Sequence, residues 1–530
     1  MPSEKTKKNN YQTLNAASKN GGINSHDQAT LKPSVKKKEN LLVENLINPN
    51  GKTEREIASE ATLPEIESSR IKIFVPAADD KPLKTDASYS EQIKQKTKEK
   101  NSEKNRKLLE GEKWVGQNGH TLTYAGLYLF SILVFFRPYE LIPALSFLST
   151  SAFFFALTTL AVYIPTQLST EGSLTILSTE VKCVLAMTAL ALLTMPIAKD
   201  PGTAWTTFND SFIKAVLMFI VMVNVLRTRR RLMGLMWLSL SVGIYLSYIA
   251  LDLFMKGEFK VEGYRVDVEV KGLFGNPNDL ALHLVTMTPI ALALALGSRS
   301  KLMRVVFYAM TGLFIAANTV TFSRGGFLGL LATGAVLAWK LGRKNRLNIS
   351  VASIAVGGLF VAFAPGNYGL RMLSIFIPAL DPVGSSDQRR ELLERSILVS
   401  LRNPWGIGIG NFPIVGIRNL VTHNSFTQIS SELGLVGLAV YLIFIISPFR
   451  KLGAIERTLF DKDERDWFYY LAIGLQASIV GYMVSSFFVS VAYNWFIYYL
   501  IAYAVAFRRI YKIERKVEKT EKDAFGLQAI

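Results

Sequence analysis

The sequence predicts an all-α polytopic membrane protein with about 12 transmembrane helices. Hydrophobic residues make up 49% of the 530 residues, and several uninterrupted apolar runs reach the roughly 20 residues that a helix needs to cross a bilayer. Basic residues gather in alternate connectors between these runs, which is typical of a chain that crosses a membrane repeatedly. Cys183 is the sole cysteine and lies in an apolar run. A single cysteine excludes an internal disulfide and a thiolate metal cluster.

The N-terminal region, residues 1–117, differs from the rest in composition. It is rich in Lys, Glu, Asn, Ser and Thr and has no sustained apolar face, which is typical of a disordered segment. It also lacks the charged start and apolar middle of a signal peptide, so we expect it to stay on the cytoplasmic side. The expected organisation is a disordered basic tail over 1–117, a transmembrane domain over 118–510 and a cytoplasmic C-terminal tail over 511–530.

The transmembrane region contains apolar stretches that are each expected to form one spanning helix. In chain order they lie near residues 121–136, 142–163, 182–198, 209–226, 232–254, 279–297, 305–322, 324–340, 347–365, 424–447, 467–488 and 490–507. These lengths fit the thickness of the hydrocarbon core.

The connectors predict the orientation of these helices. With a cytoplasmic N-terminus, alternate connectors should carry an excess of Lys and Arg, and they do. The basic connectors contain Arg227 and Arg229–Arg231, then Arg299, Lys301 and Arg304, then Lys340 to Arg346, then Arg450 to Arg465, and finally Arg508 to Lys516. Both termini are therefore predicted to be cytoplasmic. The formal net charge of +18 then follows from topology and gives no reason to expect a nucleic-acid partner.

Two long loops, residues 255–278 and 366–423, are predicted to be external. The larger loop is far longer than a simple connection and contains six arginines: Arg371, Arg389, Arg390, Arg395, Arg402 and Arg418. Positive residues are disfavoured on the external side, and the planar guanidinium suits phosphate groups. The alternative is a surface helix in which these arginines form ion pairs with Glu391 and Glu394.

Arg324 lies in the run Thr321-Phe322-Ser323-Arg324-Gly325-Gly326, between two apolar spans. An arginine at membrane depth costs several kcal/mol unless it is paired or hydrated, so Arg324 is a candidate functional residue. The glycines that follow allow a backbone or a ligand to come close. The alternative is an interfacial anchor whose charged end reaches water.

The shorter external loop ends in Gly272-Leu273-Phe274-Gly275-Asn276-Pro277-Asn278-Asp279. These residues predict a turn, and Asn278 or Asp279 is expected to cap the helix that follows. A helix N-terminus also binds anions, so capping and ligand contact both remain open. Arg265 and Lys271 precede the turn and would extend a basic vestibule.

His423 stands between the polar loop and the next apolar run, in Thr422-His423-Asn424-Ser425. A neutral imidazole can accept a proton at ordinary pH, so a histidine at the membrane surface is a candidate general base. The alternative is a residue at a helix start that only forms hydrogen bonds.

Four segments in this order resemble the O-antigen ligase and O-antigen polymerase superfamily of bacterial membrane glycosyltransferases. They are Gly272 to Ala281, Thr321 to Gly325, Asn403 to Phe412, and His423 to Gly437. The resemblance covers the chain from about Thr121 to Arg508. It implies transfer of an oligosaccharide from undecaprenyl diphosphate onto a hydroxyl acceptor at the outer face of the cytoplasmic (inner) membrane, in surface polysaccharide biosynthesis, without a metal or other cofactor.

The resemblance also implies roles for individual residues. His423 matches the essential histidine, and Arg324 and Arg389 are the arginines expected to stabilise the departing pyrophosphate, with Arg390 and Arg371 as alternatives to Arg389. Adjacent residues on a helix point to different faces, and spacing does not choose between Arg389 and Arg390. The further substrate contacts expected are Arg265, Asn276, Asn278 and Asn424.

The implied partners are a lipid-linked oligosaccharide donor, a glycan, lipid or protein hydroxyl acceptor, membrane lipids and other polysaccharide-assembly proteins. With a protein acceptor the chain would be a protein O-oligosaccharyltransferase. A secondary transporter is an alternative of another class, because about 12 spans with both termini inside is a common transporter layout. The polar groups that cluster at the outer face, and the lack of a clear repeat between the halves, disfavour it.

Overall fold

The computed structural model describes residues 119–137, 151–268, 276–343, 368–375 and 384–528, with a few single positions between them. All of them belong to one compact unit, Asp86–Ile530. The expected tail over 1–117 and most of the expected span over 347–365 lie outside the described residues. Within the described part, the secondary structure is helical and contains one isolated bridge, between Val261 and Arg265. The predicted all-α class is confirmed.

The helices follow one another with short connections, except near the long loops. In chain order they are Gly119–Phe135, α3 (Ser151–Glu171), α4 (Thr179–Thr194), α5 (Pro201–Thr207), the π-helical turn η2 (Phe208–Phe212), α6 (Ile213–Val225), α7 (Arg229–Lys256), α8 (Pro277–Gly297), α9 (Lys301–Val320), α10 (Arg324–Leu341), α12 (Tyr368–Leu373), α13 (Ser385–Arg402), α14 (Phe412–Val415), η4 (Ile417–Asn419), α15 (Ser425–Glu432), α16 (Gly434–Asp461), α17 (Trp467–Ser485), η5 (Ser486–Phe488) and α18 (Trp495–Gln528).

Seven helical segments among the described residues are long and apolar enough to cross a membrane. They are Ser151–Glu171, Pro201–Val225, Arg229–Lys256, Pro277–Gly297, Lys301–Val320, Gly434–Asp461 and Trp467–Phe488. The chain is therefore a multi-pass membrane protein. Helices Gly119–Phe135, α4, α10 and α18 correspond to further expected spans but are not among these seven. The count of 12 and the orientation of the termini stay predictions.

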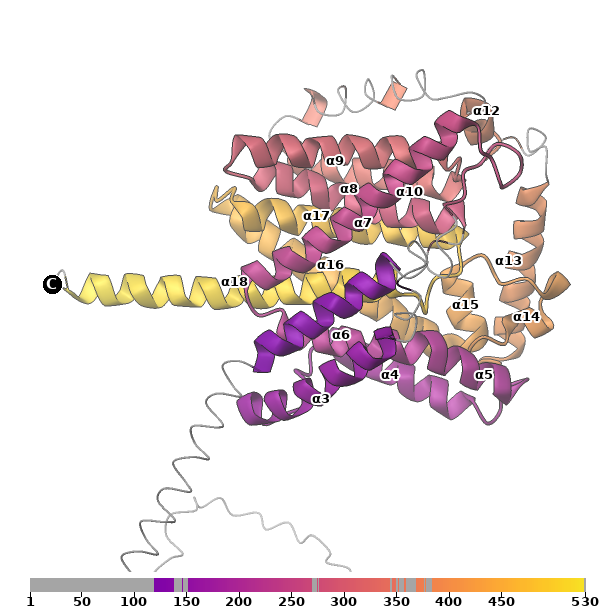
Figure 1. Ribbon diagram of the computed structural model, residues 1–530, viewed down its shortest axis with the longest axis horizontal. Coiled ribbons are helices and arrows are strands. Elements are labelled where there is room, and N and C mark those ends of the chain that lie inside the picture. Colours follow the sequence, from indigo (N-terminus) through magenta and orange to yellow (C-terminus); the bar gives the residue numbers. More distant parts are fainter. Residues whose placement is uncertain are drawn as a thin grey trace, which may run out of the picture. The chain divides into compact units, whose positions relative to one another are not determined.

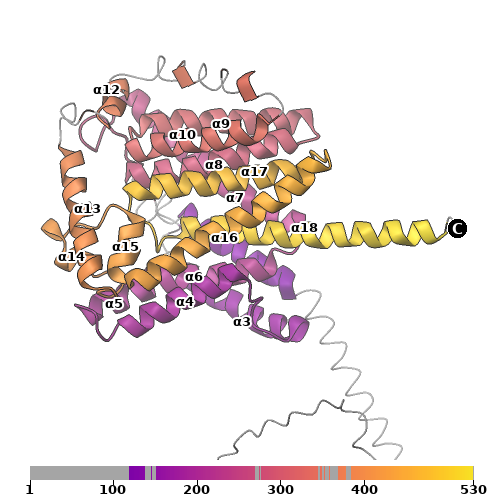
Figure 2. The same cartoon turned by 180° about the vertical axis from the view of Figure 1, so that it is seen from behind.

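Helix α8 lies at the centre of the helix packing and is buried along most of its length. It packs against α9, α10 and α17, and the long helices lie side by side in both ribbon views (Figures 1 and 2). Small residues allow these close approaches. A Cβ atom at Gly474 of α17 would lie 2.5 Å from the Cβ of Ala293 and 2.8 Å from the carbonyl oxygen of Pro289.

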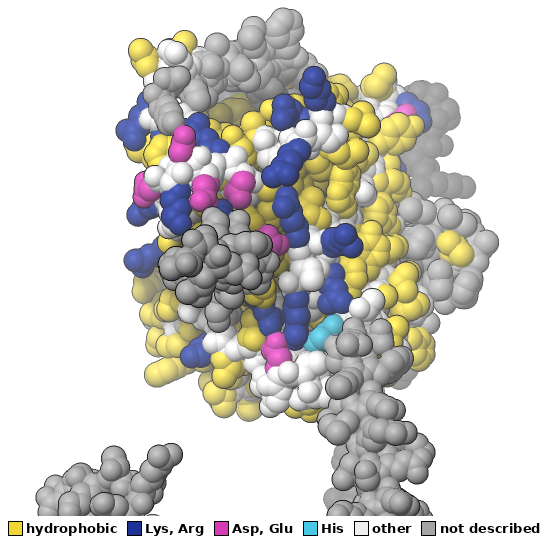
Figure 3. Space-filling model, turned by 90° about the vertical axis from the view of Figure 1, so that its left-hand side faces the viewer, with side chains coloured by type: hydrophobic (Ala, Val, Ile, Leu, Met, Phe, Trp, Pro, Cys, Tyr) yellow, Lys and Arg dark blue, Asp and Glu magenta, His cyan; other side chains and the backbone are white. Residues whose placement is uncertain are grey.

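The two ends of the packed helices differ in structure and charge. The short helices α12, α13, α14 and α15 gather at one end, where α8 and α10 begin (Figures 1 and 2). At the opposite end, many Lys and Arg side chains lie at the surface, interspersed with several Asp and Glu side chains (Figure 3). The candidate residues in the loops therefore meet at the end away from this basic face.

Candidate functional site

Helix α8 begins at Pro277, and the side chain of Asn276 caps it. The Oδ1 atom of Asn276 accepts hydrogen bonds from the backbone N–H groups of Asn278 at 2.8 Å and Asp279 at 3.1 Å. Pro277 occupies the first helical turn, where its missing N–H leaves no bond unmade. The expectation that Asn278 or Asp279 caps this helix is therefore wrong, because the proline sets the cap at the residue before it.

Asn278 instead joins the segment Gly272 to Ala281 to the segment Thr321 to Gly325. Its Oδ1 atom accepts hydrogen bonds from Arg265 Nη2 and from Ser323 Oγ, both at 2.9 Å. Ser323 also caps α10, because its Oγ accepts the backbone N–H of Gly326 at 3.2 Å. One side-chain oxygen thus ties the start of α8 to the start of α10 and holds Arg265 beside both.

The start of α10 packs unusually closely against its neighbours. Arg324 is its first residue and is only 8% exposed. A Cβ atom at Gly325 would lie 2.9 Å from the Cβ of Phe488, and one at Gly326 would lie 2.7 Å from the Cβ of Ala281. The two glycines are therefore required for packing, and they fix the position of the arginine that precedes them.

Two arginines from the long loops share one carboxylate. Arg371 Nη2 lies 2.8 Å from Glu262 Oε2, and Arg265 Nη1 lies 3.6 Å from Glu262 Oε1. The Arg371 guanidinium also lies 4.9 Å from the ring centroid of Tyr264. Burial lowers the pKa of Arg265 to about 10; Glu262 acts in the opposite direction, while Arg371 and Arg389 lower it further. Positive charge therefore exceeds negative charge at this cluster.

The same two arginines hold the turn that precedes α10. Arg265 Nε donates a hydrogen bond to the carbonyl oxygen of Thr321 at 3.0 Å, and Arg371 Nε donates to that of Phe322 at 3.4 Å. Phe322 has a left-handed backbone, with φ of 50°. A bulky residue rarely adopts this conformation, so the surrounding contacts must hold it there. The arginines are thus packed against the residues immediately before Arg324.

Helix α13 carries Arg389 and Arg390, the two adjacent arginines between which the sequence could not choose. Arg389 is partly buried, and its charge lowers the pKa of both His423 and Arg265. The Arg390 side chain is 81% exposed and forms an ion pair with Glu394 at 3.1 Å. Adjacent helical residues point about 100° apart. The structure therefore directs Arg389 toward the other candidates and Arg390 toward the surface.

His423 lies in the connection before α15. The hydroxyl oxygen of the preceding Thr422 lies 2.8 Å from that of Ser490, and the following Asn424 caps α15 by accepting two backbone N–H groups at 2.8 and 3.1 Å. His423 itself has a left-handed backbone, with φ of 50°. Burial lowers the pKa of its imidazole, and the charge of Arg389 lowers it further.

Two parts of the site were not predicted from the sequence. The connection 488–490 contacts two of the segments that carry the resemblance, Thr321 to Gly325 and His423 to Gly437. Phe488 lies against Gly325, and the Val489 carbonyl accepts a hydrogen bond from Ser425 Oγ at 2.7 Å. It was expected only to join two spans. Glu262 was also missed, although it precedes the candidate Arg265 by three residues, a spacing that could have marked it as its ion-pair partner.

The segment 403–412 leads from α13 to α14 and packs against the C-terminal end of α15. Gly406, Gly408 and Gly410 all have positive φ, between 72° and 96°. The buried Glu432 side chain accepts the backbone N–H of Gly410 at 2.9 Å, and a Cβ atom at Gly406 would lie 2.4 Å from the Glu432 carbonyl oxygen. The alternating glycines are thus needed both for backbone conformation and for close approach.

We expect Gly406→Ala to lower the stability of the protein. A left-handed conformation costs a residue with a Cβ about 1–2 kcal/mol, and the contact with the Glu432 backbone adds to this cost. Gly334→Ala is the matched control, because a Cβ there meets open space within a helix. The measurement is the midpoint of thermal unfolding in detergent. Equal midpoints for the two variants would contradict this account of the segment.

The lowered pKa of His423 gives a prediction for pH dependence. A general base works in its neutral form, so activity falls as pH drops through its pKa. Because the pKa of His423 is depressed, the acid limb of kcat/KM should lie below pH 6.5, the ordinary value for histidine. Arg389→Gln should raise this pKa, and carbethoxylation of His423 should then require higher pH. An unchanged midpoint for this modification would show that Arg389 does not act on His423.

The structure brings several predicted site residues to one end of the protein. His423, Arg389, Arg265 and Arg371 are linked by charge or contact, and Arg324 follows directly after the turn whose carbonyl groups Arg265 and Arg371 contact. Asn276 and Asn424 serve as helix caps. In the part of the chain that is described, no group of three His, Cys, Asp or Glu side chains is arranged to hold a metal ion. Metal independence stays a prediction.

Comparison with known proteins bears on the central part of this site. Residues 309–442 match the family model described as O-antigen ligase. This segment includes Arg324, Arg371, Arg389 and His423, while the motif at the start of α8 precedes it. No curated protein sequence matches the chain. The match confirms the resemblance that the ordered motifs predicted.

Proposed function

We propose that the chain transfers an oligosaccharide from a lipid-linked pyrophosphate donor onto a hydroxyl acceptor, because residues 309–442 match the family model described as O-antigen ligase. The donor would be undecaprenyl diphosphate and the location the outer face of the cytoplasmic membrane, in surface polysaccharide assembly. The observation that carries the proposal is a partly buried histidine, His423, whose pKa is lowered by the charge of Arg389, an arginine that also acts on Arg265. Such a site offers a base and an anion-binding surface together.

In the proposed reaction, His423 removes the proton from the acceptor hydroxyl. The hydroxyl oxygen attacks the anomeric carbon of the donor sugar and forms the new glycosidic bond. The bond between that carbon and the pyrophosphate oxygen breaks, and both of its electrons leave with the lipid diphosphate. The proton stays on the imidazole until solvent removes it. His423 is thus the general base, and its neutral form is favoured by its low pKa.

The arginines would stabilise the departing diphosphate. A guanidinium offers paired N–H donors that match phosphate oxygens and remains charged at working pH. Arg389 and Arg324 are proposed to meet the negative charge as it develops, which is where fixed charges accelerate a reaction most. Arg265 and Arg371 are held by Glu262 and would keep the vestibule positive. Asn278 would position Arg265.

A strain from which the gene is deleted provides the test of this function. Loss of a surface polysaccharide, restored by the wild-type chain, is expected. Complementation with Arg324→Ala should fail, because loss of one stabilising donor lowers the rate by about 10²–10³. Arg324→Lys keeps the charge without the planar fork and should restore only part of the polysaccharide. A normal polysaccharide profile in the deletion strain would argue against the proposal.

A further inference from the structure

A cavity of 780 Å³ lies between α10, α16 and α17, far from the candidate site. One wall runs along α10 from Ala335 to Lys340 and on to Arg343 just past the end of the helix, whereas Arg324 begins that helix. The helical rise of 1.5 Å per residue puts Lys340 about 24 Å from Arg324 along the axis. The cavity therefore belongs to the opposite, basic end of the packed helices (Figure 3), and the proposed transfer reaction does not use it.

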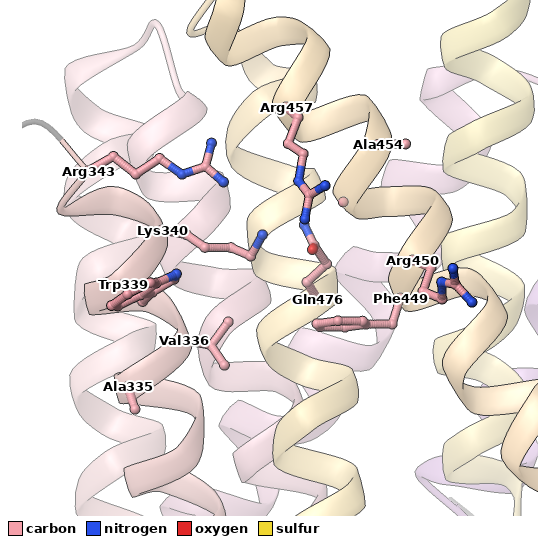
Figure 4. Close-up of a pocket in the computed structure, with 11 residues that line it drawn as sticks. Ala335, Val336, Trp339, Lys340, Arg343, Phe449, Arg450, Ala454, Arg457 and Gln476 are labelled. Atoms are coloured by element: carbon pink, nitrogen blue, oxygen red, sulfur yellow. The ribbon is translucent and has the colours of Figure 1, made fainter.

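The cavity is strongly positive. Four cationic side chains line it, Lys340, Arg343, Arg450 and Arg457, and no acidic residue does. Figure 4 shows Lys340 of α10 and Arg343, just past its end, extending toward α16, with Arg457 on α16 and Arg450 at the margin. Cations required only for membrane orientation would be expected to spread into water, whereas these converge on a hollow.

One buried carboxylate fixes two of these cations, Lys340 of α10 and Arg343 just after that helix. Glu456 has no exposed surface, and it forms ion pairs with Lys340 at 2.8 Å and with Arg343 at 2.9 Å. The single negative charge offsets only one of the two partners, and the cations of α16 form no part of this pair. Glu456 thus positions Lys340 and Arg343 at the cavity wall, and positive charge remains in excess.

A second cavity on the same basic end differs in having acidic residues in its lining. It measures 1010 Å³ and is lined by arginines together with Glu464 and Asp466. Arg515 Nη2 forms an ion pair with each of these acids; its distance to Asp466 Oδ2 is 3.5 Å. Five arginines line this cavity, Arg229, Arg299, Arg304, Arg465 and Arg515, so positive charge exceeds negative charge here too. The cavity beside α10 differs in that no acidic residue lines it.

Apart from Gln476 of α17, the remaining walls of the cavity are apolar. Ala335, Val336 and Phe449 line the side that continues along the helices, and Trp339 beside them is 62% exposed. Figure 4 places the Phe449 ring below the cationic groups. Charged groups at the end of an apolar groove match an amphipathic molecule with an anionic head and a hydrocarbon chain. Tryptophan is also enriched at the level of the lipid headgroups.

We propose that this cavity binds the phosphate headgroup of an anionic phospholipid in the adjacent leaflet. The phosphate lies among Lys340, Arg343 and Arg457, and an acyl chain follows the apolar wall of α10 and α16. Bidentate guanidinium–phosphate contacts favour this head over a zwitterionic one, whose own ammonium group opposes the cations. A lipid there would hold α10 and α16 together at the end opposite the candidate site.

Native mass spectrometry of the purified full chain, titrated with phosphatidylglycerol, tests this proposal. We expect Arg450→Gln combined with Arg457→Gln to weaken binding about fivefold for each cation removed. Neither arginine belongs to the Glu456 ion pairs, so folding should be retained. The matched control is Lys301→Gln combined with Lys462→Gln, which removes two exposed cations outside both cavities and should leave binding unchanged.

The probes separate a lipid from a free anion. Phosphatidylcholine should bind more weakly than phosphatidylglycerol, and inorganic phosphate should not displace the bound lipid at comparable concentration. Equal retention of phosphatidylglycerol by the two double variants would overturn the proposal. The proposal would also be overturned if inorganic phosphate displaced the bound phosphatidylglycerol as effectively as added lipid does. The apolar wall would then contribute nothing to binding.

Discussion

Replacing His423 with alanine is expected to lower transfer from the lipid-linked donor by about 10²–10⁴-fold, the usual contribution of a general base. The alanine removes the group proposed to take the proton from the acceptor hydroxyl, while the arginines that would hold the diphosphate remain. Binding of the donor should therefore persist while turnover is lost. The measurement is product formation by purified protein, with donor binding followed separately.

His423→Asn separates a base from a residue that only forms hydrogen bonds. Asparagine tolerates the left-handed backbone at this position, where φ is 50°, and its amide can still donate and accept hydrogen bonds. It cannot take a proton at ordinary pH. The account predicts that this variant folds as the wild type does and is as inactive as His423→Ala. Substantial activity in His423→Asn would assign the histidine a structural role.

Arg389→Ala is expected to lower transfer by about 10²–10³-fold, because it removes a donor that we propose meets the developing negative charge. Its neighbour supplies the matched control. The Arg390 side chain is 81% exposed and pairs with Glu394 on the surface, where such pairs contribute little. Arg390→Ala should therefore change the rate by no more than about twofold. Initial rates at saturating donor give the comparison.

The opposite ranking would be informative. If Arg390→Ala were the inactive variant, α13 would have to turn when substrate binds, and the geometry proposed for the donor would be wrong. If neither variant lost activity, the charge on α13 would serve only the surface. Circular dichroism of both proteins excludes loss of the helix as the cause of any difference.

Local sequence patterns predicted much of the fold. Apolar runs identified the long helices, and the break near 322–324 separates α9 from α10 as expected. A cap was predicted at the start of α8, but at Asn278 or Asp279 and not at Asn276. The capping residue depends on which residue begins the helix, and here that residue is Pro277. Such choices are set by backbone geometry that composition alone does not determine.

The site was predicted less completely because its contacts join distant segments. Sequence patterns identified His423 and the arginines individually, but only the fold brings the charge of Arg389 to His423. Glu262 contacts Arg371 across more than 100 residues, and no local pattern marks that pairing. The exposure that distinguishes Arg390 from Arg389 is likewise a result of tertiary packing. Long-range contacts are therefore the part that the sequence did not reveal.

The most direct measurement of the central claim is the fate of the donor in liposomes that contain the purified protein. With undecaprenyl diphosphate oligosaccharide and an acceptor present, the account predicts that lipid diphosphate is released in step with glycosidic bond formation. His423→Ala should release neither product at a comparable rate. Transfer at the wild-type rate by His423→Ala, or an intact donor in the presence of the wild-type protein and a competent acceptor, would contradict it.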